Sequence, residues 1–80
     1  MAQAIYCVFR DRDRWKMEVN LKRHGPYKSE HDAVRVAIET AHEAGRYNPD
    51  GAQVLLVREE NIPRIVWTYG HDPYPPTRFE

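Results

Sequence analysis

The stretch from Ser29 to Gly45 reads SEHDAVRVAIETAHEAG, and it predicts the single helix of this chain. Ser29 is a favourable N-cap, and the acidic Glu30 and Asp32 follow in the first turn, where carboxylates stabilise the helix dipole. Apolar residues recur at three- and four-residue spacing, which marks one buried stripe: Val34, Ala37, Ile38 and Ala41. Gly45 is a typical C-terminal stop. The predicted helix therefore runs from about Glu30 to Ala44.

Two strands are expected before this helix. The segment from Ala4 to Arg10 is β-branched, aromatic and apolar on both alternating faces, which is typical of a central strand. The segment from Trp15 to Lys22 alternates between apolar and polar residues, as a half-buried strand does. Because a short polar turn at residues 11–14 separates them, we expect an antiparallel hairpin.

Two more strands are expected after the helix. Val54 to Val57 is apolar on both faces and should be central. Ile62 to Tyr69 contains Pro63, which cannot donate to a ladder and so favours an edge. The resulting ββαββ pattern predicts a two-layer α+β fold. Its sheet would be four-stranded and antiparallel, with strand order 2-1-3-4, and the helix would cover one face.

The two faces of this sheet are expected to differ. The strand residues assigned to the core beneath the helix are Ile5, Cys7, Phe9, Trp15, Met17, Val19, Leu21, Ile65 and Trp67. That assignment leaves Tyr6, Val8 and Val66 on the open face, with two aliphatic residues of the third strand. The area of such a patch is near the upper limit for exposed apolar surface on a soluble monomer. We therefore expect something to cover it: a second copy of the chain, the chain's own tail or a ligand.

The chain ends in an aromatic, proline-rich segment. Residues 69–76 read YGHDPYPP, and they divide the chain into a domain of residues 1–70 and a tail of residues 71–80. One interpretation is a polyproline segment that folds back, with Tyr74 packed on the domain and Asp72 accepting backbone N–H groups. The alternative is a docking peptide for an aromatic-lined groove on a partner. We favour packing because so small a domain is short of core.

This ending resembles the signature of a family of small bacterial domains, domain of unknown function 2188. The signature is Tyr-Gly-x-Asp-Pro-aromatic-Pro-Pro, and its defined positions here are Tyr69, Gly70, Asp72, Pro73, Tyr74, Pro75 and Pro76. Trp15 and the alanine-rich helix extend the similarity over most of residues 6–78. The turn at residues 59–63 and the loop at residues 46–51 depart from the family pattern. The resemblance implies a small bacterial module without an established activity, and it supplies no catalytic residues.

Composition is that of a folded globular domain, with 30% charged and 41% hydrophobic residues. Eighty residues make one small domain of marginal stability. Cys7 is the only cysteine, which favours a reducing compartment, and no run of about 18 apolar residues occurs. We therefore expect a cytoplasmic protein that does not enter a membrane.

No pattern of reactive residues predicts catalysis. The four histidines and Cys7 lack the spacing of metal ligands. Cys7 lies within a strand and Ser29 is occupied as a cap, so neither is a good nucleophile. The glycines are scattered and form no phosphate-binding loop. We expect no enzyme activity, no metal and no cofactor.

Charge is unevenly distributed although the formal net charge is zero. Residues 1–28 carry seven Lys and Arg against three Asp and Glu, so the first hairpin could contact nucleic acid, with Tyr6 stacking on a base. The candidate contacts are Arg10, Arg12, Arg14, Lys16, Lys22 and Arg23. A pI of about 6.9 and the interspersed Asp11, Asp13 and Glu18 argue against this function.

The sequence thus favours a small noncatalytic protein-interaction module. Its expected partner is a second copy, bound as a homodimer through the open sheet face or an edge, or another protein. A nucleic-acid-binding module that uses the basic first hairpin is the alternative. A small-molecule site beneath the tail, near Tyr74, is a third hypothesis.

Overall fold

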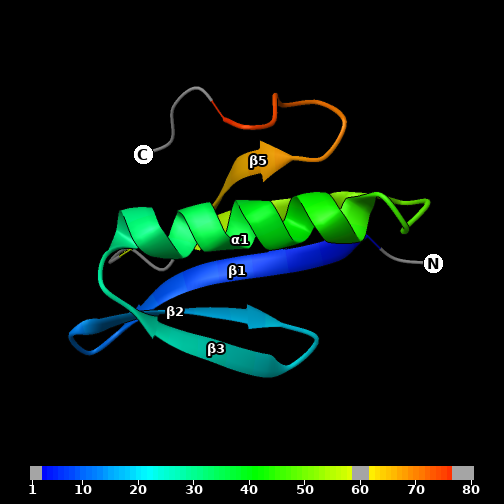
Figure 1. Ribbon diagram of the computed structural model, residues 1–80. Coiled ribbons are helices and arrows are strands. Elements are labelled where there is room, and N and C mark those ends of the chain that lie inside the picture. Colours follow the sequence, from blue (N-terminus) through cyan, green and yellow to red (C-terminus); the bar gives the residue numbers. More distant parts are fainter. Residues whose placement is uncertain (1–2, 59–61, 77–80) are drawn as a thin grey trace.

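The computed structural model describes residues 3–58 and 62–76, which form one helix and a mixed five-stranded sheet (Figure 1). The elements in chain order are β1 (Ala4–Asp11), β2 (Arg14–Val19), β3 (Lys22–Tyr27), α1 (Glu30–Gly45), β4 (Ala52–Val57) and β5 (Pro63–Thr68). The strand order across the sheet is β3-β2-β1-β4-β5. The predicted α+β class with a single helix is confirmed. The predicted features at residues 59–61 and 77–80 lie outside the described residues.

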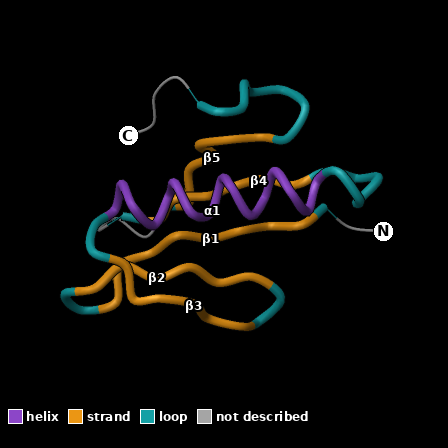
Figure 2. The backbone as a smooth tube through the Cα atoms, in the orientation of Figure 1, coloured by secondary structure: helices purple, strands orange, loops and turns teal. Residues whose placement is uncertain are grey.

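Helix α1 begins at the predicted Glu30 and ends one residue beyond the predicted Ala44, because Gly45 is its last helical residue and Arg46 is the C-cap. The Ser29 side chain accepts a hydrogen bond from the Asp32 N–H at 3.1 Å, as an N-cap does. The helix lies along one face of the sheet (Figure 2). Its buried stripe consists of Ala33, Val34, Ala37, Ile38 and Ala41. Because three of these residues are alanines, the helix axis can approach the sheet closely.

The predicted second strand, Trp15 to Lys22, is wrong in extent, because this segment contains most of β2, a turn and the first residue of β3. β2 ends at Val19, and β3 begins at Lys22 after a two-residue turn. Asn20 and Leu21 have φ of 53° and 65°, the paired positive values of a type I′ turn. The apolar–polar alternation continues through this turn, so Leu21 looked like a core residue. It lies instead at the hairpin tip with 93% of its surface exposed.

The extra strand also overturns the predicted all-antiparallel sheet with order 2-1-3-4. β3 reverses the chain once more before α1 begins, so the helix returns the chain to the end of the sheet where β1 starts. β4 consequently runs parallel to β1, while the three other neighbouring pairs are antiparallel. The unit β1–α1–β4 is a crossover connection, which parallel strands require.

The predicted faces of β1 are inverted. Tyr6 and Val8 were expected on the open face, but they lie beneath α1 with 6% and 0% exposed surface. Their partners on β4 are the buried Val54 and Leu56. The alternating residues Ile5, Cys7 and Phe9 occupy the opposite face. Because both sets are apolar, alternation in the sequence could not decide between them.

A bulge in β5 places Ile65 and Trp67, which were predicted to share a face, on opposite faces of the sheet. Val54 pairs with Trp67, but Leu55 pairs with Ile65, so Val66 is an extra residue on β5. Trp67 consequently points beneath the helix, whereas Ile65 points to the open face. Val66, predicted on the open face, is half-buried and packs against the core.

The turn between β2 and β3 gives the first testable prediction. Leu21→Gly should raise the free energy of unfolding by about 1 kcal/mol, because glycine adopts a left-handed conformation without the steric cost that leucine carries. Urea denaturation measures the change. Asn20→Gly is the matched control and should gain less, since asparagine tolerates this conformation. A loss of stability in Leu21→Gly would mean that the exposed side chain makes a stabilising contact.

Candidate interaction face

The sheet face opposite α1 carries six apolar side chains on three adjacent strands. They are Ile5, Cys7 and Phe9 on β1, Leu55 and Val57 on β4, and Ile65 on β5. Ile5 is 38% exposed and Ile65 is 60% exposed, and no element of the described chain packs over them. This set, called the open apolar face below, takes the place of the predicted Tyr6, Val8 and Val66.

The β2 and β3 side of the same face is charged. Lys16 Nζ lies 3.1 Å from Asp11 Oδ2, and its hydrogen bond and charge lower the pKa of the Asp11 carboxyl. Arg23 pairs with Glu18 at 3.4 Å and lies 5.2 Å from the centre of the Phe9 ring. These four charges sum to zero, but Arg14, which pairs with Asp11 across the hairpin, lies on the same face. The open apolar face is therefore bordered by a polar rim with one positive charge in excess.

Cys7 sits within the open apolar face but has the character of a structural residue. Its side chain is half-buried, and this burial and the nearby Glu18 carboxylate both raise the pKa of the thiol. A reactive cysteine requires the opposite environment, which stabilises the thiolate. The surroundings of Cys7 therefore do not favour nucleophilic chemistry at this position.

Both edges of the sheet are poorly suited to pairing with another strand. β3 contains Pro26, and its register with β2 shifts between Trp15 and Met17. β5 begins at Pro63 and contains the bulge at Val66. Prolines and bulges at edges are devices that prevent strand addition. The two edges are thus weaker candidates for an interface than the open apolar face.

The first part of the tail forms a compact clip at the end of β5. Asp72 Oδ2 accepts the N–H of Thr68 at 2.8 Å, and the Asp72 N–H returns a bond to the Thr68 carbonyl at 2.9 Å. Trp67 Nε1 donates to the carbonyl of Pro73 at 3.0 Å. Gly70 completes the turn with φ of 82°, a conformation that favours glycine. Gly70 and Asp72, which belong to the signature described above, therefore each have a structural role in the clip.

The clip directs the following residues onto the helix side of the molecule. The Tyr74 ring stacks on His42 of α1, with 3.8 Å between ring centres and 6° between planes. A hollow of about 210 Å³ lies between this part of the tail and α1. It is lined by Arg35, Ile38, Glu39, Tyr74, Pro75 and Pro76. This is where the small-molecule hypothesis placed a site, and the space is below the usual size of a ligand pocket.

The candidate nucleic-acid contacts do not form one continuous strip. Lys16 and Arg23 are held in ion pairs with Asp11 and Glu18. Arg10 Nε donates to the Arg12 carbonyl at 3.0 Å. Lys22 is exposed at the start of β3, whereas Arg12, Arg14 and Lys16 line a hollow at the β1–β2 turn, at the other end of β2. Tyr6 is buried, so it cannot stack on a base.

The sequence interpretation missed the side chains that make the open apolar face. Leu55 and Val57 could not be assigned, because strand β4 is apolar on both sides. Ile65 was wrongly predicted in the core beneath the helix, because the bulge in β5 has no clear signal in the sequence. Across residues 3–58 and 62–76, no three His, Cys, Asp or Glu side chains gather where they could hold a metal ion. In the same residues, no helix is long and apolar enough to cross a membrane.

In comparisons with protein-family models, curated proteins and solved structures, nothing matches this chain. The resemblance to domain of unknown function 2188 therefore stays a prediction that rests on residues 69–76. The function must be argued from the geometry of the molecule itself.

The clip gives a prediction about stability. Asp72→Ala should lower the free energy of unfolding by about 1–2 kcal/mol, because the Thr68 N–H loses a charged acceptor. Urea denaturation followed by tryptophan fluorescence measures the loss. The neighbouring exposed His71→Ala is the control and should change stability by less than about 0.5 kcal/mol. Equal effects of the two changes would show that the clip contributes nothing.

The junction of α1 with the tail gives a second prediction. Alanine usually stabilises a helix relative to glycine by about 1 kcal/mol. At Gly45, however, a Cβ atom would lie 2.5 Å from Cγ of Tyr69, so Gly45→Ala should destabilise the protein by about 1–3 kcal/mol. In a Tyr69→Ala background the same change should be neutral or favourable. Additive effects in this double-mutant cycle would contradict the proposed clash.

Proposed function

We propose that this protein is a noncatalytic interaction module that associates with a second copy of itself through the open apolar face. The observation that carries the proposal is the group of six apolar side chains on β1, β4 and β5 that no described element covers. Contiguous apolar surface of this kind marks interaction sites in small proteins.

The described tail does not provide the cover. Tyr74 stacks on His42 of α1, and the Trp67 indole that binds the Pro73 carbonyl belongs to the buried side of β5. Residues 69–76 thus lie on the helix side of the sheet. The sequence suggests a second copy, the tail or a ligand as the cover of the open face. Because residues 69–76 lie on the helix side, the described part of the tail is not that cover.

The charges of the face permit a second copy as the partner. The rim consists of the ion pairs Lys16–Asp11 and Arg23–Glu18 and the additional cation Arg14, and the whole chain has a formal net charge of zero. Two identical faces therefore meet with one excess positive charge on each copy, which is a small repulsion. A strongly charged partner would gain little from such a rim, because complementary potentials select partners of opposite charge.

The size of the face sets the expected strength of association. Five strands about 4.8 Å apart and about six residues long give an outline of roughly 20 by 20 Å. A stable dimer buries about 800 Å² of accessible surface on each partner. The outline of the whole face, including its charged rim, is about 400 Å², which is half of that area. We therefore expect a two-fold dimer whose dissociation is measurable at roughly micromolar concentration.

Ile65→Glu tests the proposal. The side chain is 60% exposed on an edge strand, so the change should leave folding intact while placing a charge in the apolar interface. Sedimentation equilibrium over about 1–500 μM should show half-dissociation of the wild-type dimer near about 1 μM and of the Ile65→Glu dimer near about 100 μM, a weakening of roughly 100-fold. Leu21→Glu is the matched control, because it adds the same charge at an exposed aliphatic position outside the face.

Two outcomes would contradict the proposal. An Ile65→Glu dimer as stable as the wild-type dimer would place the interface elsewhere, and a wild-type protein that stays monomeric at the highest concentration would exclude self-association. Labelling of Cys7 by a maleimide gives an independent measure. Its rate should fall as the wild-type concentration rises, and in Ile65→Glu it should fall only at roughly 100-fold higher concentration.

A further inference from the structure

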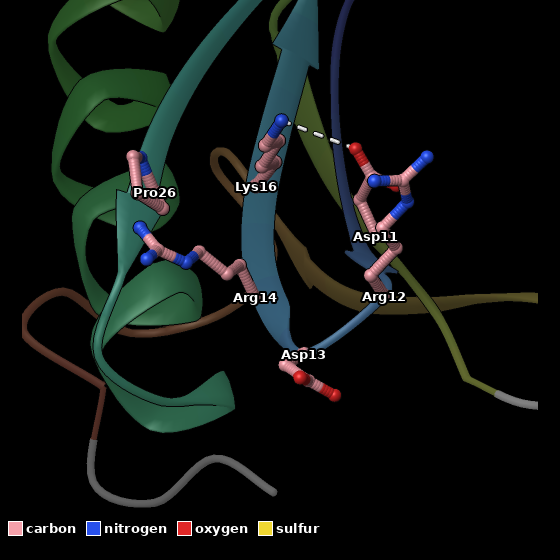
Figure 3. A pocket seen from close by; sticks show the side chains of 6 residues that line it. All are labelled: Asp11, Arg12, Asp13, Arg14, Lys16 and Pro26. Carbon is pink, nitrogen blue, oxygen red and sulfur yellow. Dashed lines mark hydrogen bonds and ion pairs between the residues drawn. The ribbon is translucent and has the colours of Figure 1, made fainter.

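A second surface feature lies at the turn between β1 and β2. Here the chain forms an open hollow of about 440 Å³, lined by Asp11, Arg12, Asp13, Arg14, Lys16 and Pro26. In Figure 3, Arg14 extends toward Pro26 on one side of β2, Arg12 and Asp11 lie on the other, and Lys16 stands between them. Cationic side chains thus surround the hollow from separate directions.

The charges around the hollow leave a positive excess. Asp11 is bound by Lys16 at 3.1 Å, and the charge of Arg12 also helps to lower its carboxyl pKa. Within the described residues, no ion pair joins Arg14 to a carboxylate. A guanidinium without a carboxylate partner offers a rigid fork of donors suited to a phosphate.

Arg12 is the first residue of the two-residue turn that joins β1 to β2, and the favoured forms of such a turn need a positive φ at this position. Its φ is 63°, a left-handed conformation that glycine adopts far more readily than arginine. Arg10 Nε holds this conformation by donating to the Arg12 carbonyl at 3.0 Å. The positive φ is therefore a cost of the hairpin, and replacement by glycine removes this cost together with the side chain.

We propose that this hollow binds a small phosphorylated molecule. Arg14 and Arg12 bind its phosphate, and Asp13 accepts hydrogen bonds from its hydroxyl groups. The volume lies within the range of small-molecule sites. A nucleic-acid strand fits less well, because Tyr6 is buried and Arg23 is paired with Glu18 beside Phe9. The site shares Asp11 and Lys16 with the charged rim of the open apolar face, but the proposal does not depend on the apolar side chains of that face.

Replacement of Arg12 by glycine separates the two roles of the residue. Arg12→Gly should raise the melting temperature by about 5 °C, because the strain is relieved. It should also weaken the binding of ribose 5-phosphate, followed by amide chemical shifts at low salt, roughly tenfold. Leu21→Gly relieves strain at the other hairpin and should bind as the wild type does. Full binding by Arg12→Gly would overturn the proposal.

Changes at Arg14 and Asp13 identify the ligand chemistry. Arg14→Gln should weaken both ribose 5-phosphate and inorganic pyrophosphate about tenfold, whereas Arg35→Gln on α1 should weaken neither. Asp13→Asn should weaken only the sugar phosphate. If neither probe shifts the amide signals of residues 11–16 at millimolar concentration, the hollow is not a phosphate site. If only a single-stranded oligonucleotide shifts them, the small-molecule proposal is replaced by nucleic-acid binding.

Discussion

The parallel pairing of β1 with β4 beneath α1 is the constraint on which the rest of this structure depends. It aligns Tyr6 with Val54 and Val8 with Leu56, and these side chains form the floor on which the helix stripe rests. A parallel pair needs a crossover, and α1 supplies it. At the carboxyl end of β4, Arg58 binds both carboxylate oxygens of Glu30, which ties the first turn of the helix to the sheet. Once this pairing is fixed, the identity of both sheet faces follows.

The helix and the tail are coupled through one contact. Gly45 ends α1, and its missing side chain makes room for the Tyr69 ring, which begins the clip. The Tyr69 N–H donates to the Ala52 carbonyl at 2.9 Å, so the clip is also anchored to the start of β4. A residue that looks like a simple helix stop in the sequence thus positions the tail. Because the domain has little core to spare, the aromatic contacts of His42, Trp67 and Tyr74 add packed surface on the helix side.

The sequence predicts the elements that carry a local signal. The cap at Ser29 and the apolar stripe define α1 because each acts within a few residues. The same sequence could not reveal the turn at Leu21, since a leucine with φ of 65° has no favourable local signal and continues the alternation. Nor could it fix the faces of β1 and β4, because both alternations are apolar. The bulge at Val66 depends on pairing between strands, which is a tertiary property.

The faces of β1 and β4 could not be assigned because both strands are apolar on both sides, and this same property produces the proposed interface. A patch was expected on the open face because β1 and β4 carry more apolar side chains than one helix can cover. That excess does not depend on which alternation faces the helix: inverting β1 exchanges Tyr6 and Val8 for Ile5, Cys7 and Phe9 and leaves the opposite face apolar. The existence of an exposed apolar face is therefore a consequence of composition, whereas its residues are a consequence of register. A single helix over a sheet that is apolar on both sides leaves one apolar side uncovered.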